Sequence, residues 1–594
     1  MSDLEHSIGA RYQVCIIPKR VAIPLLNFTR YMKSLITALL FILFCLASLC
    51  ASDWPQEAGP LRHNFTPEDP GPVSWSEDRP DIAWQAYAGL GQSPVSVVGD
   101  RVYVLGAWRE DADLSDGITP KEMDVLQKDN RWLDSEGNHL KFSGSLVYQG
   151  AVYLQCFALK DGARIWTQRM TQNSYVSILY SDRTTPLVHN GRVYAHTFDG
   201  HLGCFDAETG ERYWQHDLRD FGLSEIRGKG GNWCSPLLVD GDKIVVNYQC
   251  GDPDNPKGKY SLMVTAFSPS NGERIWSSKP LSGGFRTTKT SINVGVIDGV
   301  ETIVVPNGRY VQGLRADSGE IAWVFDVRAE LPNPHGIEYD KKPFSYFYTN
   351  RLPLISGNRV INQLWLWYGQ KGSRTYCFEV KDGKATLVWD TPDVISWQGD
   401  HIVHEGIFYA FDARFDRFNR WAEKGPNHQV APRRDGVRQF QAYDIDSGSL
   451  MWSSSDLSHY TPRPIHMLKK SPELKEQVAA LPKNLNELPY RELETYWRND
   501  LILEDNMNMY KGEAEYIIAG KTLIAWFLGN RLEIAHLLPQ GGLKPLAEWH
   551  FEGTTRNPTT PVYAHGHLLL RALDHRQGIA GGEGNLIAIN LAAD

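Results

Sequence analysis

Seven polar or aromatic residues stand shortly before segments that we predict to be the opening strands of a repeated four-stranded unit. They are Asp182, Arg183, Trp233, Lys289, Arg351, Trp397 and Arg556. Arg and Lys donate hydrogen bonds to anionic groups, and Trp offers a flat apolar surface. If these side chains converge, they suit a carboxylated, aromatic or sugar-like ligand. The alternative is that they pair with local acidic residues and cap loops.

Sequence motifs for metal binding and catalysis give weaker evidence than these seven residues. His401 and His404 are three residues apart on a predicted strand, so their side chains point to opposite faces and do not share an ion. Asp252 and Asp254 offer oxygen ligands for calcium, but acidic residues beside proline are ordinary turn formers. The chain has no Gly-x-Ser-x-Gly elbow and no His-Glu-x-x-His segment. We therefore predict neither a metal site nor catalytic residues.

The repeated unit that must position the seven residues is clearest between Thr185 and Gln215. Strand-like runs are separated there by Asn190-Gly191, Asp199-Gly200 and Thr209-Gly210. Asn-Gly and Asp-Gly pairs favour tight hairpins, because both central positions take positive φ. Four antiparallel strands in about 31 residues are the size of one propeller blade.

A Trp on the last strand marks each repeat. The marked residues are Trp84, Trp166, Trp214, Trp276, Trp323, Trp389, Trp452 and Trp549. The eighth unit is split, because Asn585–Asp594 supplies a third strand and Asp81–Trp84 supplies the fourth. Eight units, closed by pairing of the two terminal segments, predict an all-β, eight-bladed propeller. The size of a Trp side chain suits a structural role in packing blades together.

Uneven spacing between these Trp residues indicates insertions at 108–144, 411–436 and 453–512. The last insertion contains two runs with apolar residues at helical spacing, one beginning at Ser471-Pro472 and one at Pro489. We therefore predict a partly helical insertion within the propeller. The sequence does not show which face of the propeller carries it.

The first 51 residues have the features of an export signal. Arg30 and Lys33 precede the apolar run Leu35–Leu49, which is shorter than the roughly 20 residues that span a bilayer. We predict that residues 1–51 are the signal, with 1–31 as an upstream extension, and that 52–594 form the exported propeller. An uncleaved membrane anchor is the alternative.

Charge and cysteine content narrow the function further. The net charge of −9 gives no basic footprint for nucleic acid or for an anionic membrane. Only five of the eight cysteines follow the signal, and an odd number without fixed spacing predicts no disulfide framework.

The pattern of turn residue, Gly and Trp resembles the tryptophan-docked blades of quinoprotein dehydrogenases with repeats of the pyrroloquinoline quinone type. It is also similar to the noncatalytic propeller lipoprotein of outer-membrane assembly. The resemblance extends over about residues 54–594 and implies the propeller fold, with the eight Trp residues packed between blades. Quinone alcohol dehydrogenases of this shape carry an adjacent cysteine pair above the cofactor, whereas this chain has neither Cys-Cys nor a Cys-x-x-Cys-His haem motif.

We therefore predict a noncatalytic, monomeric scaffold that is exported to the periplasm or outside the cell, with membrane association left open. It binds an envelope protein or a small polar ligand through the end of the channel and the insertions, without a cofactor. We expect no nucleic-acid partner, and no membrane-spanning domain after signal cleavage. The alternative is an atypical alcohol or sugar dehydrogenase with pyrroloquinoline quinone and calcium, because some quinone glucose dehydrogenases lack the cysteine pair.

Overall fold

The computed structural model describes the second of two compact units, Met1–Cys50 and Ala51–Asp594. The described residues are 52–73, 80–89, 91–109, 147–171, 174–177, 184–223, 234–251, 261–281, 291–331, 347–348, 352–366, 374–391, 394, 401–412, 439–454, 514–527, 531–551, 559–571 and 585–591. The predicted export signal and most of the three predicted insertions lie outside these ranges.

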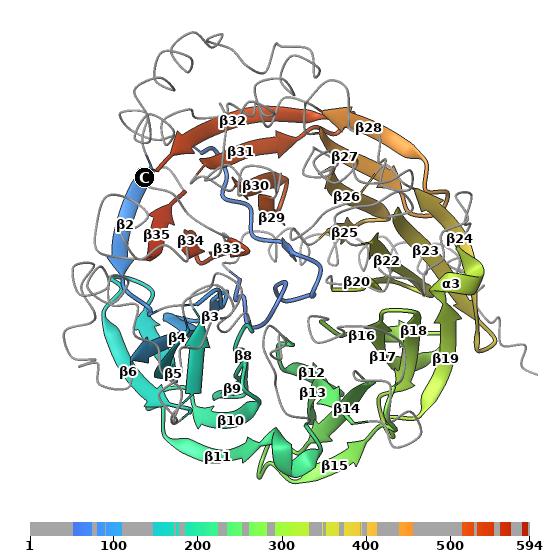
Figure 1. Cartoon of the computed structure of the whole chain (residues 1–594). Coiled ribbons are helices and arrows are strands. Elements are labelled where there is room, and N and C mark those ends of the chain that lie inside the picture. Colours follow the sequence, from blue (N-terminus) through green and yellow to red (C-terminus); the bar gives the residue numbers. More distant parts are fainter. Residues whose placement is uncertain are drawn as a thin grey trace, which may run out of the picture. The chain divides into compact units, whose positions relative to one another are not determined.

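Eight antiparallel sheets are arranged around a ring in this unit (Figure 1). In each sheet four strands follow in hairpin order, from an inner strand near the centre of the ring to an outer strand at the rim. The predicted eight-bladed β-propeller is confirmed.

Each blade consists of four strands, ordered from the inner to the outer one. Blade 1 comprises β3 (Ser96–Val98), β4 (Arg101–Arg109), β5 (Val147–Ala158) and β6 (Arg164–Arg169), and blade 2 comprises β8 (Leu187–His189), β9 (Arg192–His196), β10 (His201–Asp206) and β11 (Arg212–Asp217). Blade 3 comprises β12 (Leu237–Val239), β13 (Lys243–Cys250), β14 (Ser261–Phe267) and β15 (Arg274–Ser277), and blade 4 comprises β16 (Asn293–Ile297), β17 (Val300–Asn307), β18 (Tyr310–Arg315) and β19 (Ile321–Asp326). Blade 5 comprises β21 (Leu354–Ser356), β22 (Arg359–Leu366), β23 (Arg374–Lys381) and β24 (Lys384–Thr391), and blade 6 comprises β25 (Ile402–His404), β26 (Ile407–Asp412), β27 (Gln439–Asp444) and β28 (Leu450–Ser454). Blade 7 comprises β29 (Ala514–Ala519), β30 (Thr522–Phe527), β31 (Arg531–Leu537) and β32 (Leu543–His550), and blade 8 comprises β33 (Val562–Ala564), β34 (His567–Arg571), β35 (Leu586–Asn590) and β2 (Asp81–Ala86).

A few short elements lie outside this plan. The remaining strands are β1 (Phe65–Thr66), beside β29, β7 (Ser174–Ser177), beside β5, and β20 (Phe347–Tyr348), beside β22. The helical turns of the described residues are η2 (Leu218–Phe221) and α3 (Val327–Glu330). No helix among the described residues has the length and apolar character needed to cross a membrane.

Blade 8 closes the ring, because its outer strand comes from the other end of the chain. Strand β2 pairs antiparallel with β35, and Trp84 lies opposite Ala588. The predicted closure by terminal segments is therefore confirmed. Arg571, only 1% exposed, strengthens the junction with blade 1 by donating to the carbonyl oxygens of Ser93 (2.8 Å) and Leu105 (2.6 Å).

The two faces of the propeller carry different connections. Because neighbouring strands are antiparallel, turns from first to second strand and from third to fourth strand share one face, which we call the turn face. First turns such as Asn190-Gly191 (φ 48° and 69°) and Asp298-Gly299 (φ 52° and 75°) are tight hairpins. Connections from second to third strand, and from one blade to the next, begin and end on the opposite face, the loop face.

Long connections are confined to the loop face. Apart from residues 74–79, every connection that contains residues outside the described ranges joins strand ends on that face. The insertions predicted at 108–144, 411–436 and 453–512 fall in the connections that follow β4, β26 and β28. Strand order thus shows that these three connections begin and end on the loop face.

Seven of the marked Trp residues share one position, opposite a small residue and beside a shift in strand register. The pairs are Trp84–Ala588, Trp166–Cys156, Trp214–Cys204, Trp276–Ala266, Trp323–Gly313, Trp389–Cys377 and Trp452–Ala442. In blade 7, Ala547 occupies this position, and Trp549 lies two residues further along β32, opposite Leu532. The third and fourth strands of blade 8, β35 and β2, are distant in the sequence, so no continuous turn joins them. A Trp of blade 7 therefore has no such turn to contact in the next blade.

Indole N–H groups connect neighbouring blades. Five of them donate to a main-chain oxygen of the next blade's turn between third and fourth strands: Trp84 to Leu159 (2.6 Å), Trp166 to Ala207 (3.2 Å), Trp214 to Pro269 (3.2 Å), Trp276 to Ala316 (3.2 Å) and Trp389 to Ile445 (2.9 Å). Glycine in that turn allows the approach. Gly210, for example, has φ 73°, and a Cβ there would lie 2.6 Å from the Trp166 ring.

Candidate binding face

The seven residues proposed for ligand binding all belong to connections on the loop face. Asp182, Arg183, Trp233, Lys289, Arg351, Trp397 and Arg556 each lie outside the described residues. The structure therefore gives no side-chain geometry for them. The structure does describe the starts of the inner strands, at which those connections end.

Hydrogen bonds between neighbouring blades link the starts of these inner strands. The bonds are Ser93 Oγ to Thr184 O (2.7 Å), Thr185 N to Ser235 Oγ (2.9 Å), Asn293 Nδ2 to Pro353 O (2.8 Å) and Thr560 Oγ1 to Glu515 Oε2 (3.3 Å). Ser or Thr followed by Pro recurs in four of these segments, and proline restricts the preceding residue to extended conformations. These residues mark the blades in the sequence, but their bonds were not predicted, since each partner belongs to another blade.

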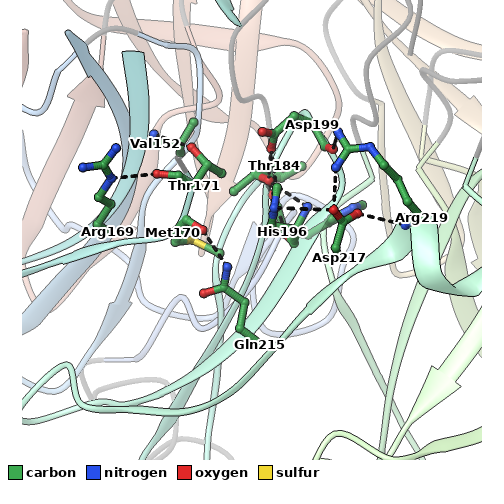
Figure 2. Close-up of polar contacts among 12 residues, drawn as sticks. Val152, Arg169, Met170, Thr171, Thr184, His196, Asp199, Gln215, Asp217 and Arg219 are labelled. Carbon is green, nitrogen blue, oxygen red and sulfur yellow. Dashed lines mark hydrogen bonds and ion pairs between the residues drawn. The ribbon is translucent and has the colours of Figure 1, made fainter. Parts of the chain in front are cut away.

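A fully buried histidine lies next to Thr184, which precedes the inner strand of blade 2 (Figure 2). His196, at the end of β9, contacts the carbonyl oxygen of Cys234 through Nδ1 at 2.9 Å, and its own carbonyl oxygen accepts a hydrogen bond from Thr184. Its Nε2 has no hydrogen-bond partner among the residues that the structure describes. Burial lowers the pKa of His196 to about 4, so the ring is neutral at pH 7 and donates from Nδ1.

A cluster of charged side chains that includes Asp199, Asp217 and Arg219 lies in the same blade (Figure 2). Asp199 Oδ1 accepts from Thr197 Oγ1 at 2.5 Å and contacts His201 Nδ1 at 3.1 Å. Arg219 pairs with Asp217 at 2.6 Å and also donates to the carbonyl oxygen of Asp199 at 3.1 Å. Burial opposes protonation of His201, but Asp199 and Asp217 outweigh it, so its pKa is raised. The Arg219–Asp217 pair is the more exposed part of the cluster and contributes little stability.

Side-chain to main-chain hydrogen bonds surround the end of β6, and one of them joins blade 2 to blade 1. Gln215 Nε2 donates to the carbonyl oxygen of Met170 at 2.6 Å, and Arg169 Nε donates to that of Thr171 at 2.8 Å (Figure 2). The Thr171 hydroxyl accepts from the amide of Val152 at 2.9 Å. These bonds hold the chain in place where it leaves β6.

Four of the five described cysteines are unsuited to act as nucleophiles. All five are buried, and no disulfide joins them: Cys156, Cys204, Cys234, Cys250 and Cys377. Burial raises the pKa of Cys156 and Cys204 to about 11, and that of Cys234 and Cys377 to about 12. The thiol form therefore predominates at neutral pH in these four residues.

The two histidines weighed for metal binding have separate partners. His401 is buried, with Nδ1 3.2 Å from the Tyr516 hydroxyl, whereas the His404 ring stacks on Phe65 at 3.7 Å. Within the described residues, no three His, Cys, Asp or Glu side chains form a group able to hold a metal ion. Asp252 and Asp254, weighed for calcium, lie outside the described ranges. The described side chains at the starts of the inner strands take part in hydrogen bonding and packing.

Comparison with known proteins adds the family. The family model described as outer membrane protein assembly factor BamB matches residues 81–311 and 261–488, which is more than half of the chain. The chain belongs to this family. Two relatives carrying that name come from Burkholderia pseudomallei (29% identical over 184 residues) and Bordetella pertussis (22% identical over 292 residues).

These alignments cover only part of each protein. The match to the Burkholderia relative covers 29% of this chain and 44% of the relative, and the match to the Bordetella relative covers 46% and 65%. The chain thus aligns with less than half of the length of the first relative. Among solved structures, the quinohemoprotein alcohol dehydrogenase of Comamonas testosteroni is similar over 92% of this chain and 82% of its own, with a TM-score of 0.51 and 12% identity. At that identity the similarity concerns the fold alone.

The described residues do not fit the quinone and calcium site that the dehydrogenase resemblance implies. The chain lacks an adjacent cysteine pair, and no metal-binding group is assembled among the described side chains. Glu57 and Arg62 form an ion pair at 3.1 Å with little exposure, and Arg62 also contacts Asn293 at the start of the inner strand of blade 4.

Proposed function

We propose that the protein is a noncatalytic, exported β-propeller scaffold that binds a protein of the cell envelope through its loop face. The observation that carries this proposal is the distribution of connections. All three insertions and all seven candidate residues belong to connections that begin and end on the loop face, whereas the first turns of the opposite face are tight hairpins. Long loops on a rigid scaffold are where binding residues concentrate.

Family membership supports the class of partner. The relatives are named outer membrane protein assembly factors, so the proposed partner is a protein of outer-membrane assembly. An exported chain with a predicted signal at 1–51 has access to such a partner in the periplasm. Basic and aromatic residues such as Arg183, Arg351 and Trp397 suit an acidic or aromatic surface on that partner.

The proposal is tested by photo-crosslinking from matched positions on the two faces in envelopes of the native host. A photoreactive residue is introduced at one of three exposed loop-face residues, Asp220, Lys279 and Glu330, or at one of three exposed turn-face residues, Glu208, Asn271 and Asp382. We expect adducts with one outer-membrane assembly protein, identified by mass spectrometry, from loop-face positions. Adduct yields from turn-face positions should be lower by a factor of about ten or more.

Two further results decide where on the loop face the partner binds. Replacing Arg183 and Arg351 by Gln should reduce the adduct yield if the candidate residues make the contact. Unchanged yield would place the contact on the insertions. Equal crosslinking from both faces, or adducts from the turn face alone, would contradict the proposal.

A further inference from the structure

Residues 52–73, which we call the hub segment, run through the centre of the ring (blue in Figure 1). They contact the inner strand, or its first turn, of six blades. The contacts are Trp54 with Val97 of blade 1, Pro55 with Val188 of blade 2, Arg62 with Asn293 of blade 4, Phe65 with His404 of blade 6, β1 with β29 of blade 7, and Glu68 with His565 of blade 8. The contacted blade residues, from Val97 to His565, are far apart in the sequence.

Much of this contact is main-chain pairing. Trp54 exchanges hydrogen bonds with Val97 in both directions, at 2.8 and 2.9 Å, and Val188 N donates to the carbonyl oxygen of Pro55 at 2.8 Å. Ile518 and Gly520 of blade 7 donate to the carbonyl oxygens of Asn64 (3.0 Å) and Thr66 (2.8 Å). An inner strand is the edge of its sheet and has main-chain groups without a strand partner. The hub segment satisfies several of them, as an added peptide strand does.

Two buried side chains anchor the segment. Trp54 is 1% exposed and packs in a core that includes residues of blades 1, 7 and 8. Arg62 is 4% exposed. Its guanidinium donates to Asn293 Oδ1 (3.1 Å), the carbonyl oxygen of Ile292 (2.8 Å) and Glu57 (3.1 Å). A charge this deeply buried is retained only with such partners.

Two carboxylates fasten the segment at the junction of blades 8 and 1, where the ring closes. Glu68 accepts hydrogen bonds from the amides of His565 (3.0 Å), Gly566 (2.7 Å) and Ser52 (2.7 Å). Asp53 accepts from the amide of Gly99 of blade 1 at 2.8 Å and contacts His565 Nε2 of blade 8 at 2.7 Å. Hydrogen bonds to an ionised carboxylate are among the stronger ones in proteins.

We propose that the centre of the propeller is a peptide-binding site, and that the hub segment is its ligand in the same chain. The ligand class is an extended, proline-rich polypeptide with one Trp and one Arg as buried anchors and a carboxylate for the first turn of blade 8. Seven of the 22 positions from Ser52 to Val73 are Pro or Gly, five of them Pro, and Pro-rich chains have little conformational entropy to lose on binding. This site is independent of the loop-face partner.

The test is to cut the link between the segment and the ring after folding. A protease site replaces residues 74–79 in the full chain, and the folded protein is cleaved and passed through a gel-filtration column. We expect the cleaved hub segment to elute with the ring. Labelled synthetic peptide 52–73 should then exchange into the cleaved protein. Immediate loss of the segment, with an unchanged thermal unfolding midpoint, would overturn the proposal.

Matched variants show whether retention depends on the described contacts. Glu68→Gln should release the segment about 10- to 100-fold faster, because charge-assisted hydrogen bonds are lost. Leu61→Ala is the control, since Leu61 is 59% exposed, and its release rate should equal that of the unaltered segment. If the Glu68→Gln chain does not fold, peptides with and without this change are compared for exchange into cleaved protein of unaltered sequence. Equal rates for all peptides would also overturn the proposal.

Discussion

Trp276→Ala is expected to lower the free energy of unfolding by about 3–5 kcal/mol. Trp276 lies on the outer strand β15, is 9% exposed and donates its indole N–H to Ala316 of blade 4 at 3.2 Å. The ring also covers Gly319, where a Cβ would lie 2.5 Å from it. We propose that it joins blades 3 and 4, so its removal leaves a cavity and an unpaired carbonyl between them. Chemical denaturation followed by circular dichroism measures the loss.

The neighbouring residue provides the control for Trp276. Ile275 lies on the same strand but is 46% exposed, so Ile275→Ala should change the free energy of unfolding by about 1 kcal/mol or less. Similar losses for the two variants would show that Trp276 has no special part in joining blades. The same comparison at Trp549 should give a smaller loss, because Trp549 lies outside the shared position.

Acid should destabilise the protein through His196 by about 3 kcal/mol between pH 7 and pH 4. Burial lowers the pKa of His196 from 6.5 to about 4. Between these values the unfolded chain binds a proton that the folded protein does not, so stability falls as the pH decreases. Below about pH 4 both states are protonated, and this contribution stays lost.

The measurement is the free energy of unfolding at a series of pH values for the unaltered protein and for His196→Gln. The difference between the two curves isolates this histidine from other groups that titrate. Thr184→Val is the control, because it removes the hydrogen bond to the His196 carbonyl oxygen but keeps the ring. That variant should be less stable at every pH and retain the full acid-dependent loss. Identical pH dependence in His196→Gln and the unaltered protein would contradict the buried neutral state.

The blades were predictable because each one is specified locally. In blade 2 the predicted turns at Asn190-Gly191, Asp199-Gly200 and Thr209-Gly210 all fall between consecutive strands of β8 to β11. Asn190, Gly191 and Gly200 take positive φ, whereas Asp199 does not. Ring closure also followed from sequence, because Asn585–Asp594 and Asp81–Trp84 are two parts of one repeat. Repetition makes a weak local signal strong.

The hub segment was not predictable in this way. Its proline- and glycine-rich sequence has neither strand nor helix periodicity, so it reads as a linker. Its partners are also remote, as in the bond between Arg62 and Asn293. The register of Trp549 was also not predicted, because strand pairing within blade 7 places Ala547 and not Trp549 at the shared position. Convergence of the seven candidate residues remains a prediction, since all of them lie outside the described ranges.

A calorimetric titration distinguishes the scaffold most directly from a quinoprotein dehydrogenase. Residues 52–594 are titrated with pyrroloquinoline quinone in the presence of calcium, after thermal unfolding has shown that the protein is folded. For a noncatalytic scaffold we predict no saturable heat. Saturable binding at one site per chain with micromolar or tighter affinity would contradict that account and assign the protein to the quinone-dependent oxidoreductases.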